Sequence, residues 1–172
     1  MILRPLALED EAEALIAHSE LAKDDFEFLL GYEPGMPWSN YLEQLKRESI
    51  GLNLPEDRVQ ATFLIAVDAG NLVGRSSIRH TLNDFLFNYV GHIGYGVRPE
   101  FRRRGFASQI MTRSLNLIFE FGVNRVLMTC SDDNIGSAKI IEAHGGVLEN
   151  KVEFKGVTKR RYWISNLSEE SK

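Results

Sequence analysis

The chain has 172 residues, of which 44% are hydrophobic and 26% are charged, and its formal net charge is −4 at pH 7. This length and composition are typical of one globular domain, so we predict a single domain over residues 1–172 and exclude a disordered chain. The acidic balance excludes general nucleic-acid binding by the whole surface, and no window approaches the ~20 consecutive apolar residues of a membrane span.

The first part of the chain carries one strand signal and two helix signals. Residues 1–6 are apolar and contain an X-Pro step, which favours an extended first strand. The Ala, Leu and Ile spacing over residues 9–24 predicts an amphipathic helix. Residues 41–52 predict a second helix, with Ser39 or Asn40 as its cap. We therefore expect two helices before the main sheet.

The middle of the chain is rich in β-branched and aromatic residues. Residues 61–80 form two β-rich runs around Gly70 and Asn71, which tolerate positive φ, so we expect a hairpin there. Residues 90–97 predict the next strand. This strand contains three glycines, Gly91, Gly94 and Gly96. Because glycine weakens a strand, we expect a ligand to lie against it, the alternative being a tightly packed or twisted strand.

The last part of the chain returns to helical spacing and then to strands. Residues 107–122 predict a helix that ends at Gly122. A strand over residues 123–131, a short helix over residues 134–146 and a final hairpin over residues 147–165 follow. The element order predicts an α/β (α+β) mixed sheet flanked by helices. It lacks the regular βαβ alternation of a Rossmann domain.

A basic turn, RRRGFAS over residues 102–108, lies between a predicted strand and a predicted helix. Free backbone N–H groups and the positive end of the helix dipole meet at such a helix start, so they bind anions. Gly105 and Ala107 are small enough for a ligand to approach the backbone closely. The lysine of a Walker A loop is absent, so a diphosphate without a catalytic role fits better. A solvated basic turn is the simpler alternative.

At these residues the sequence resembles the GNAT superfamily of acetyl-CoA-dependent N-acetyltransferases, most closely a bacterial subgroup of predicted acetyltransferases. Arg102, Gly105 and Ala107 match the family motif R/Q-x-x-G-x-G/A. A second motif, N-x-x-S-x-x-ϕ-x-E-x-x-G, is matched by Asn134, Ser137, Ile140, Glu142 and Gly145. Two motifs at the correct separation are stronger than either alone. The resemblance is clearest from Phe63 to Gly146.

The resemblance implies a GNAT-like fold whose central sheet is splayed, with the pantetheine arm of acetyl-CoA between residues 92–97 and residues 125–131. Val97 would offer backbone groups to pantetheine or to the thioester carbonyl, a catalytic role. The residues implied in cofactor binding are Tyr95, Gly96, Val97, Arg102, Arg103, Arg104, Gly105, Phe106, Ala107, Ser108, Asn134 and Ser137. Asn134 and Ser137 also suit a helix cap without any ligand. No metal is implied.

The implied reaction is direct attack of a primary amine on the thioester, which requires no protein nucleophile. Cys130 is then a small buried filler, and an acyl-cysteine route is the alternative. Many members of this superfamily place a tyrosine as general acid where this chain has Ile141. Either Tyr89 or Tyr162 takes its place, or no acid is needed, because a thiol with a pKa of ~8.5 leaves as a thiolate without full protonation.

For the general base, His92 has a suitable intrinsic pKa, with His80 and Glu149 as further candidates. Because His92 alternates with Gly94 and Gly96 along the strand, a structural histidine is the competing interpretation. A water relay would remove the need for any single base.

The acceptor of the acetyl group is a small molecule or a peptide that the sequence does not identify. Residues 24–44 are acidic and aromatic, which suits a cationic amine, or they form an ordinary amphipathic helix with a solvated face. Lys159, Arg160 and Arg161 suit an edge strand. The exposed final hairpin is compatible with a homodimer.

Two further function classes share these features. A non-catalytic acyl-CoA-binding or sensing module would explain Ile141, and a nucleotide- or phosphate-binding regulatory domain would use the same turn. The single cysteine excludes an intrachain disulfide, and the N-terminus becomes acidic too early for a secretory signal. We therefore predict a cytoplasmic N-acetyltransferase.

Overall fold

The computed structural model describes residues 1–166, and residues 167–172 lie outside this range. The first four strands form one antiparallel sheet in the order β1-β2-β3-β4. They are β1 (Ile2–Arg4), β2 (Ala61–Asp68), β3 (Asn71–Arg79) and β4 (Ile93–Val97). The predicted hairpin is confirmed, but its turn lies one residue earlier than expected. Ala69 and Gly70 have the positive φ angles, 47° and 82°, and Asn71 already belongs to β3.

The last three strands form a second antiparallel sheet in the order β5-β7-β6. They are β5 (Arg125–Ser131), β6 (Val147–Phe154) and β7 (Val157–Ser165). Because β7 is the central strand, the expectation that Arg160 and Arg161 are edge charges was wrong. Arg160 Nε lies 2.5 Å from Asp132 Oδ1, and Arg161 Nη1 lies 2.8 Å from Glu149 Oε2.

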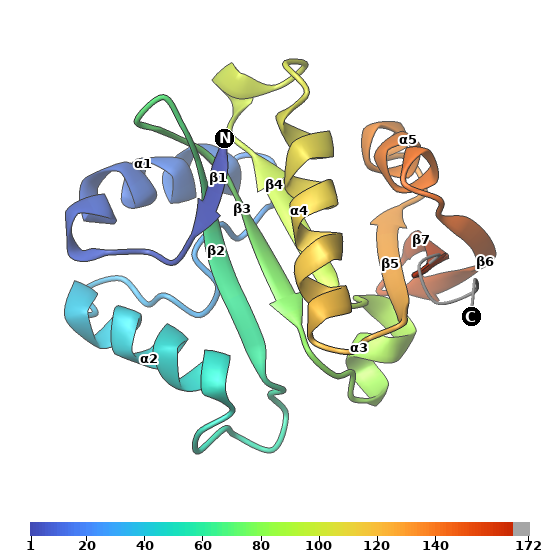
Figure 1. Ribbon diagram of the computed structural model, residues 1–172, viewed down its shortest axis with the longest axis horizontal. Helices are drawn as coiled ribbons and strands as arrows, with labels where there is room; N and C mark the ends of the chain where they lie inside the picture. Colours follow the sequence, from blue (N-terminus) through green and yellow to red (C-terminus); the bar gives the residue numbers. More distant parts are fainter. Residues whose placement is uncertain (167–172) are drawn as a thin grey trace.

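The two sheets meet at one end of β4 and β5. Gly91 bridges Met128, and the backbone N–H of His92 donates to the carbonyl of Leu127 at 2.8 Å. Beyond this junction β4 and β5 diverge, and α4 packs across the gap (Figure 1). A Cβ on Gly91 would lie 2.4 Å from the Leu127 carbonyl oxygen, so this glycine permits the junction. The close approach of the β5 backbone, and not a ligand, therefore accounts for the glycine at position 91.

Helices cover both faces of the first sheet. On one face, α1 (Glu11–Ala22) and α2 (Trp38–Ile50) enclose a core that includes Phe63 and Ile65. On the other face, α4 (Phe106–Glu120) packs against β3 and β4, and α5 (Ile135–Ala143) packs against α4 and β5. Leu64 and Ile78 of the first sheet share one buried cluster with side chains of both helices, of β5 and of β7. This shared core joins the two sheets where their strands no longer pair. Among the described residues, no helix is both long and apolar enough to cross a membrane.

Two local details differ from the sequence predictions. The N-cap position of α2 is Pro37, so Ser39 and Asn40 lie inside the helix and neither caps it. A short helix that we did not predict, α3 (Asp84–Tyr89), connects β3 to β4, and the Asn83 side chain accepts the Leu86 N–H at 3.0 Å. Two short 3-10 helices, η1 (Leu8–Asp10) and η2 (Pro99–Phe101), complete the elements.

Candidate active site

A cavity of about 700 Å³ opens where β4 and β5 diverge. We call it the β4–α4 cavity. Its walls come from the end of α1, from β4, from the turn before α4 and from the start of α5, and every residue predicted to contact the cofactor lines it except Arg104. The guanidinium of Arg104 instead lies 5.5 Å from the ring centroids of both Phe101 and Phe106.

The basic turn presents free backbone donors to this cavity. Arg103 and Gly105 have φ angles of 59° and 80°, and Gly105 forms the N-cap of α4 without a side-chain cap. The backbone N–H groups of residues 103–108 have no backbone acceptor among the described residues. The next N–H, that of Gln109, donates to the Gly105 carbonyl at 3.2 Å. The N–H groups of residues 103–108 are therefore available to an anion.

Arg102 is engaged by the protein itself. Its Nε donates to the Val97 carbonyl at 3.1 Å, and its Nη2 lies 2.6 Å from Asp24 Oδ2. This arrangement ties the end of β4 and the segment after α1 to the basic turn. The Arg102 guanidinium thus fixes the shape of the turn, and the backbone N–H groups are the donors that remain open.

Three further predicted residues line the opposite wall. The buried hydroxyl of Tyr95 has no hydrogen-bond partner of normal geometry among residues 1–166, and burial raises its pKa, an effect that the nearby Ser137 hydroxyl opposes. Asn134 Oδ1 accepts the backbone N–H of Ser137 at 3.0 Å, which confirms the helix-cap interpretation. Ser137 keeps its hydroxyl beside the cavity.

Comparison with known families now decides the class of this protein. The acetyltransferase (GNAT) domain matches residues 1–147, which includes the N-terminal helices that the two motifs do not reach. The chain belongs to the GNAT acetyltransferase family. GNAT proteins are acyltransferase enzymes that use acetyl-CoA and an amine acceptor, so the non-catalytic sensor and the phosphate-binding regulator lose their support.

Individual GNAT relatives agree with this assignment. The uncharacterized N-acetyltransferase YjdG of Bacillus subtilis is 27% identical over 141 residues, which cover 78% of this chain and 79% of YjdG. The structure of yncA from Salmonella typhimurium with its cofactor acetyl-CoA covers 99% of this chain and 96% of its own, at a TM-score of 0.64 and 14% identity. A mutant of spermidine N-acetyltransferase SpeG from Vibrio cholerae covers 98% and 100%, at a TM-score of 0.65 and 20% identity. The two structures share the fold of this chain.

Within this GNAT fold, His92 lies at the junction of the two sheets and not in the lining of the β4–α4 cavity. It is 6% exposed, and its Nδ1 accepts the backbone N–H of Leu127 at 2.9 Å. The ring thus hydrogen-bonds the first residues of β5 to β4, which is the structural role that the sequence left open. The other two base candidates are also engaged: His80 Nε2 lies 2.8 Å from Thr62 Oγ1, and Glu149 pairs with Arg161.

The stability of the protein is expected to depend on the protonation of His92. Burial lowers the pKa of His92 to about 4, from an ordinary value of 6.5. Between these values the unfolded chain binds a proton that the folded protein does not. The stabilisation is therefore complete above pH ~6.5 and is lost as the pH falls towards ~4, by up to about 3 kcal/mol.

The variant His92→Gln tests this expectation. Urea unfolding at about pH 5 and about pH 7.5 should show a smaller loss of stability on acidification in the variant than in the wild type. The same variant should keep the wild-type pH dependence of kcat/KM. A shift of that profile would restore His92 as a general base.

The tyrosines proposed to replace Ile141 do not line the β4–α4 cavity. Ile141 itself is fully buried in the core. Tyr162 is also fully buried, and its hydroxyl donates to Glu142 Oε1 at 3.0 Å. The ring of Tyr89 packs against Phe154, with 4.5 Å between the ring centroids. Tyr95 is the tyrosine that lines this cavity.

The expectation that residues 24–44 receive a cationic amine was wrong for their largest aromatic side chains. Phe28 and Trp38 belong to the core between the first sheet and the two N-terminal helices. The carboxylate of Asp24 pairs with Arg102, and Glu27 Oε1 accepts the backbone N–H of Gly31 at 2.8 Å. These four side chains are therefore engaged within the protein, and an acceptor has to bind other side chains.

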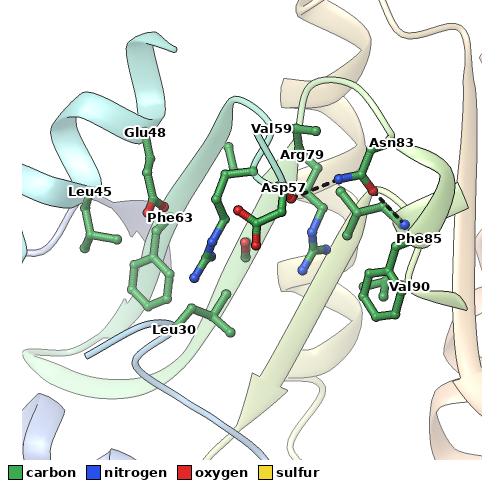
Figure 2. Close-up of a pocket in the computed structure, with 14 residues that line it drawn as sticks. Leu30, Leu45, Glu48, Asp57, Val59, Phe63, Arg79, Asn83, Phe85 and Val90 are labelled. Atoms are coloured by element: carbon green, nitrogen blue, oxygen red, sulfur yellow. Dashed lines mark hydrogen bonds between the residues drawn. The ribbon is translucent and has the colours of Figure 1, made fainter. Parts of the chain in front are cut away.

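Sequence analysis missed a second cavity of about 440 Å³, which Figure 2 shows. We call it the α2–α3 cavity, because α2, α3 and the β2–β3 hairpin enclose it. Arg79 lines it, and Arg75 lies two positions before Ser77 on the same face of β3. The signal was present in the sequence: the alternation Arg75, Ser77, Arg79 places charge on a face of β3 that the helices cover.

Proposed function

We propose that this enzyme transfers the acetyl group of acetyl-CoA directly to a primary amine of a small molecule or peptide. The nitrogen of the neutral amine forms a bond to the acetyl carbon, the bond from that carbon to the CoA sulfur breaks, and sulfur leaves with the electron pair as a thiolate. The amine loses one proton, which balances the thiolate, so that the products are the acetylated amine and CoA. No acyl-enzyme is formed. The observation that carries the proposal is the row of free backbone N–H groups at residues 103–108, a segment that lines the β4–α4 cavity with all its residues except Arg104.

The residues of this cavity fit acetyl-CoA, which supplies the acetyl group as a thioester. Backbone N–H groups at a helix start suit the pyrophosphate, and a Cβ on Gly105 would meet no atom within 4 Å, so the space before these groups is open. The unpartnered Tyr95 hydroxyl is a donor for the pantetheine arm. We assign the pyrophosphate to residues 102–108 and the arm to Tyr95, Gly96 and Val97.

Direct transfer is favoured over a route through Cys130. This cysteine is 8% exposed and belongs to the core cluster beneath α4 and α5. Burial raises the pKa of its thiol, so the nucleophilic thiolate is disfavoured. The chain therefore contributes binding, orientation and backbone hydrogen bonds to the reaction.

The test is CoA release from acetyl-CoA by the purified protein across a panel of amino acids, polyamines, aminoglycosides and peptides, with acetyl-CoA binding measured in parallel by calorimetry. Binding together with amine-dependent CoA release is the expected result. Absence of acetyl-CoA binding would overturn the assignment of residues 102–108. Binding without release for every amine would contradict the proposed acceptor class.

A further inference from the structure

Two neighbouring arginines on β3 lack a carboxylate partner. Arg75 is 3% exposed, and its guanidinium donates to the carbonyls of Gly94 and Glu27 at 2.9 and 2.8 Å. Arg79 Nη1 donates to the Gly91 carbonyl at 3.3 Å. Neither arginine forms an ion pair with any residue in the described range 1–166. Neutral carbonyls accept only some of these donors: the buried Nε of Arg75 has no hydrogen-bond partner in the described range, and the Arg75 guanidinium lies 4.4 Å from the centroid of the Phe26 ring. No carboxylate compensates either positive charge.

The two guanidiniums lie beside each other on the surface of β4. A Cβ on Gly94 would lie 3.5 Å from Arg75 Nη1 and 3.8 Å from Arg79 Nη1, so the missing side chain leaves room for both. Burial, together with the positive charge of Arg79, lowers the pKa of Arg75 to about 9. Like charges held together in a partly buried site are typical of a site for an anion.

Arg79 is the member of this pair that a ligand reaches. Its guanidinium lies in the α2–α3 cavity, next to the α3 wall formed by Phe85 and Val90 (Figure 2). Arg58 lines the same cavity from the exposed loop before β2. Burial and the charge of Arg58 together lower the pKa of Arg79 to about 10. Two arginines thus face a cavity of small-molecule size.

Two carboxylates, those of Glu48 and Asp57, line the same cavity as the two arginines. Glu48 accepts from Gln44 Nε2 at 3.2 Å, and Asp57 is exposed on the loop. Neither forms an ion pair with Arg58 or Arg79 within the described part of the chain. The remaining wall is apolar and consists of Leu30, Leu45, Val59, Ala61, Phe63, Phe85, Leu86 and Val90. The cavity therefore offers two guanidiniums and two carboxylates, which form no ion pairs with each other, beside an apolar surface.

The α2–α3 cavity reaches the strand that forms the wall of the β4–α4 cavity. Ser77 on its floor pairs with Gly94, and Arg75 pairs with Gly96, which lines the β4–α4 cavity. Gly94 and Gly96 are two residues apart along β4, a distance of about 7 Å in a strand. A small molecule in the α2–α3 cavity thus lies next to Tyr95, Gly96 and Val97, the segment of β4 assigned to the pantetheine arm.

We propose that the α2–α3 cavity binds the acceptor, an inference that rests on the proposed function. Arg79, with Arg58 at the rim, binds an anionic group that the acceptor carries beside its amine. Carboxylate and phosphate share the required chemistry, because an arginine fork donates two parallel hydrogen bonds to either. The apolar wall suits an alkyl or aryl portion. The acceptor class is therefore a small, partly apolar amine with a negative charge, such as an amino acid.

The first experiment measures anion binding without any turnover. Calorimetry with 3-phenylpropanoate, which has no amine, and with the matched alcohol 3-phenylpropan-1-ol separates charge from shape. We expect the carboxylate to bind and the alcohol to bind at least about tenfold more weakly. Arg79→Gln and Arg58→Gln should each weaken carboxylate binding about tenfold or more, whereas Arg113→Gln, an exposed arginine on α4, should not change it.

The second experiment measures CoA release with matched acceptor pairs. Phenylalanine is compared with phenethylamine, 6-aminohexanoate with pentylamine, and phosphoethanolamine with ethanolamine. We expect the anionic member to have the higher kcat/KM in at least one pair, and Arg79→Gln to remove that preference through KM. The pair that responds distinguishes carboxylate from phosphate acceptors.

The outcomes that overturn this inference differ from those that overturn the proposed function. Equal binding of 3-phenylpropanoate and its alcohol, or a preference for cationic amines that survives Arg79→Gln, would refute the anion site while CoA release continued. Absence of CoA release with all amines would contradict the proposed function, and the calorimetric comparison would still decide whether Arg79 binds an anion. Because Arg58 is exposed, Arg58→Gln is expected to fold even where Arg79→Gln does not.

Discussion

Gly105→Val is expected to weaken acetyl-CoA binding at least about tenfold, measured by calorimetry. Gly105 is the N-cap of α4, and the space where its Cβ would project is open and adjoins the free N–H groups of residues 103–108. A branched side chain would occupy that space and prevent the pyrophosphate from approaching. The positive φ of 80° adds a cost in stability of about 1–2 kcal/mol, because L-residues with a Cβ disfavour this region.

The control for this variant is Gly122→Val at the other end of α4. Gly122 has a φ of 85°, and a Cβ there would also meet no atom within 4 Å. Both variants therefore carry a similar backbone strain, but Gly122 does not line the β4–α4 cavity. Equal acetyl-CoA affinity in the two variants would show that the turn does not hold the cofactor.

Gly91→Ala is expected to destabilise the protein by at least about 3 kcal/mol, measured by urea unfolding. Two costs combine at this position. The φ of 81° disfavours alanine, and the new Cβ would lie 2.4 Å from the Leu127 carbonyl oxygen. This oxygen belongs to the backbone of β5, so relief of the clash requires the two sheets to separate at their only bridge in the described range.

The variant Gly35→Ala measures the cost of the positive φ alone, without a steric clash of the new Cβ. Gly35 has a φ of 86°, and a Cβ there would meet no atom within 4 Å. This variant should lose only about 1–2 kcal/mol, the cost of the left-handed backbone for a residue with a Cβ. If both variants lost the same amount, the contact with Leu127 would not contribute, and the junction would tolerate a side chain at residue 91.

The local sequence was sufficient to predict most of the helices and strands and to recognise the basic turn. Helices over α1, α4 and α5 and the strands of both sheets follow from apolar periodicity, which depends only on residue spacing. The turn at residues 102–108 was recognisable because a glycine between a strand and a helix start exposes backbone donors whatever surrounds it. The short helix α3 escaped prediction, since its six residues carry too little periodicity.

The assignment of individual side chains in the site depended on contacts between residues far apart in the chain. Arg102 seemed free for a phosphate until the fold brought Asp24 beside it, and His92 seemed free for catalysis until Leu127 used its ring as an acceptor. A Cβ on Gly96 would lie 2.6 Å from the Phe26 ring, so a side chain distant in sequence packs against this glycine. No spacing pattern encodes such contacts, because the partners lie on different elements.

The sequence by itself thus determined most of the element types, the family motifs and the basic turn at residues 102–108, all of which arise from residues close together in the chain. The family resemblance implied that β4 and β5 diverge, and the structure confirms it. Only the tertiary structure decided that His92 is structural and that Arg75 and Arg79 lie together without a carboxylate partner. The physical reason is the same in each case: burial and charge compensation depend on what packs against a residue. Those neighbours come from the fold, not from the local sequence.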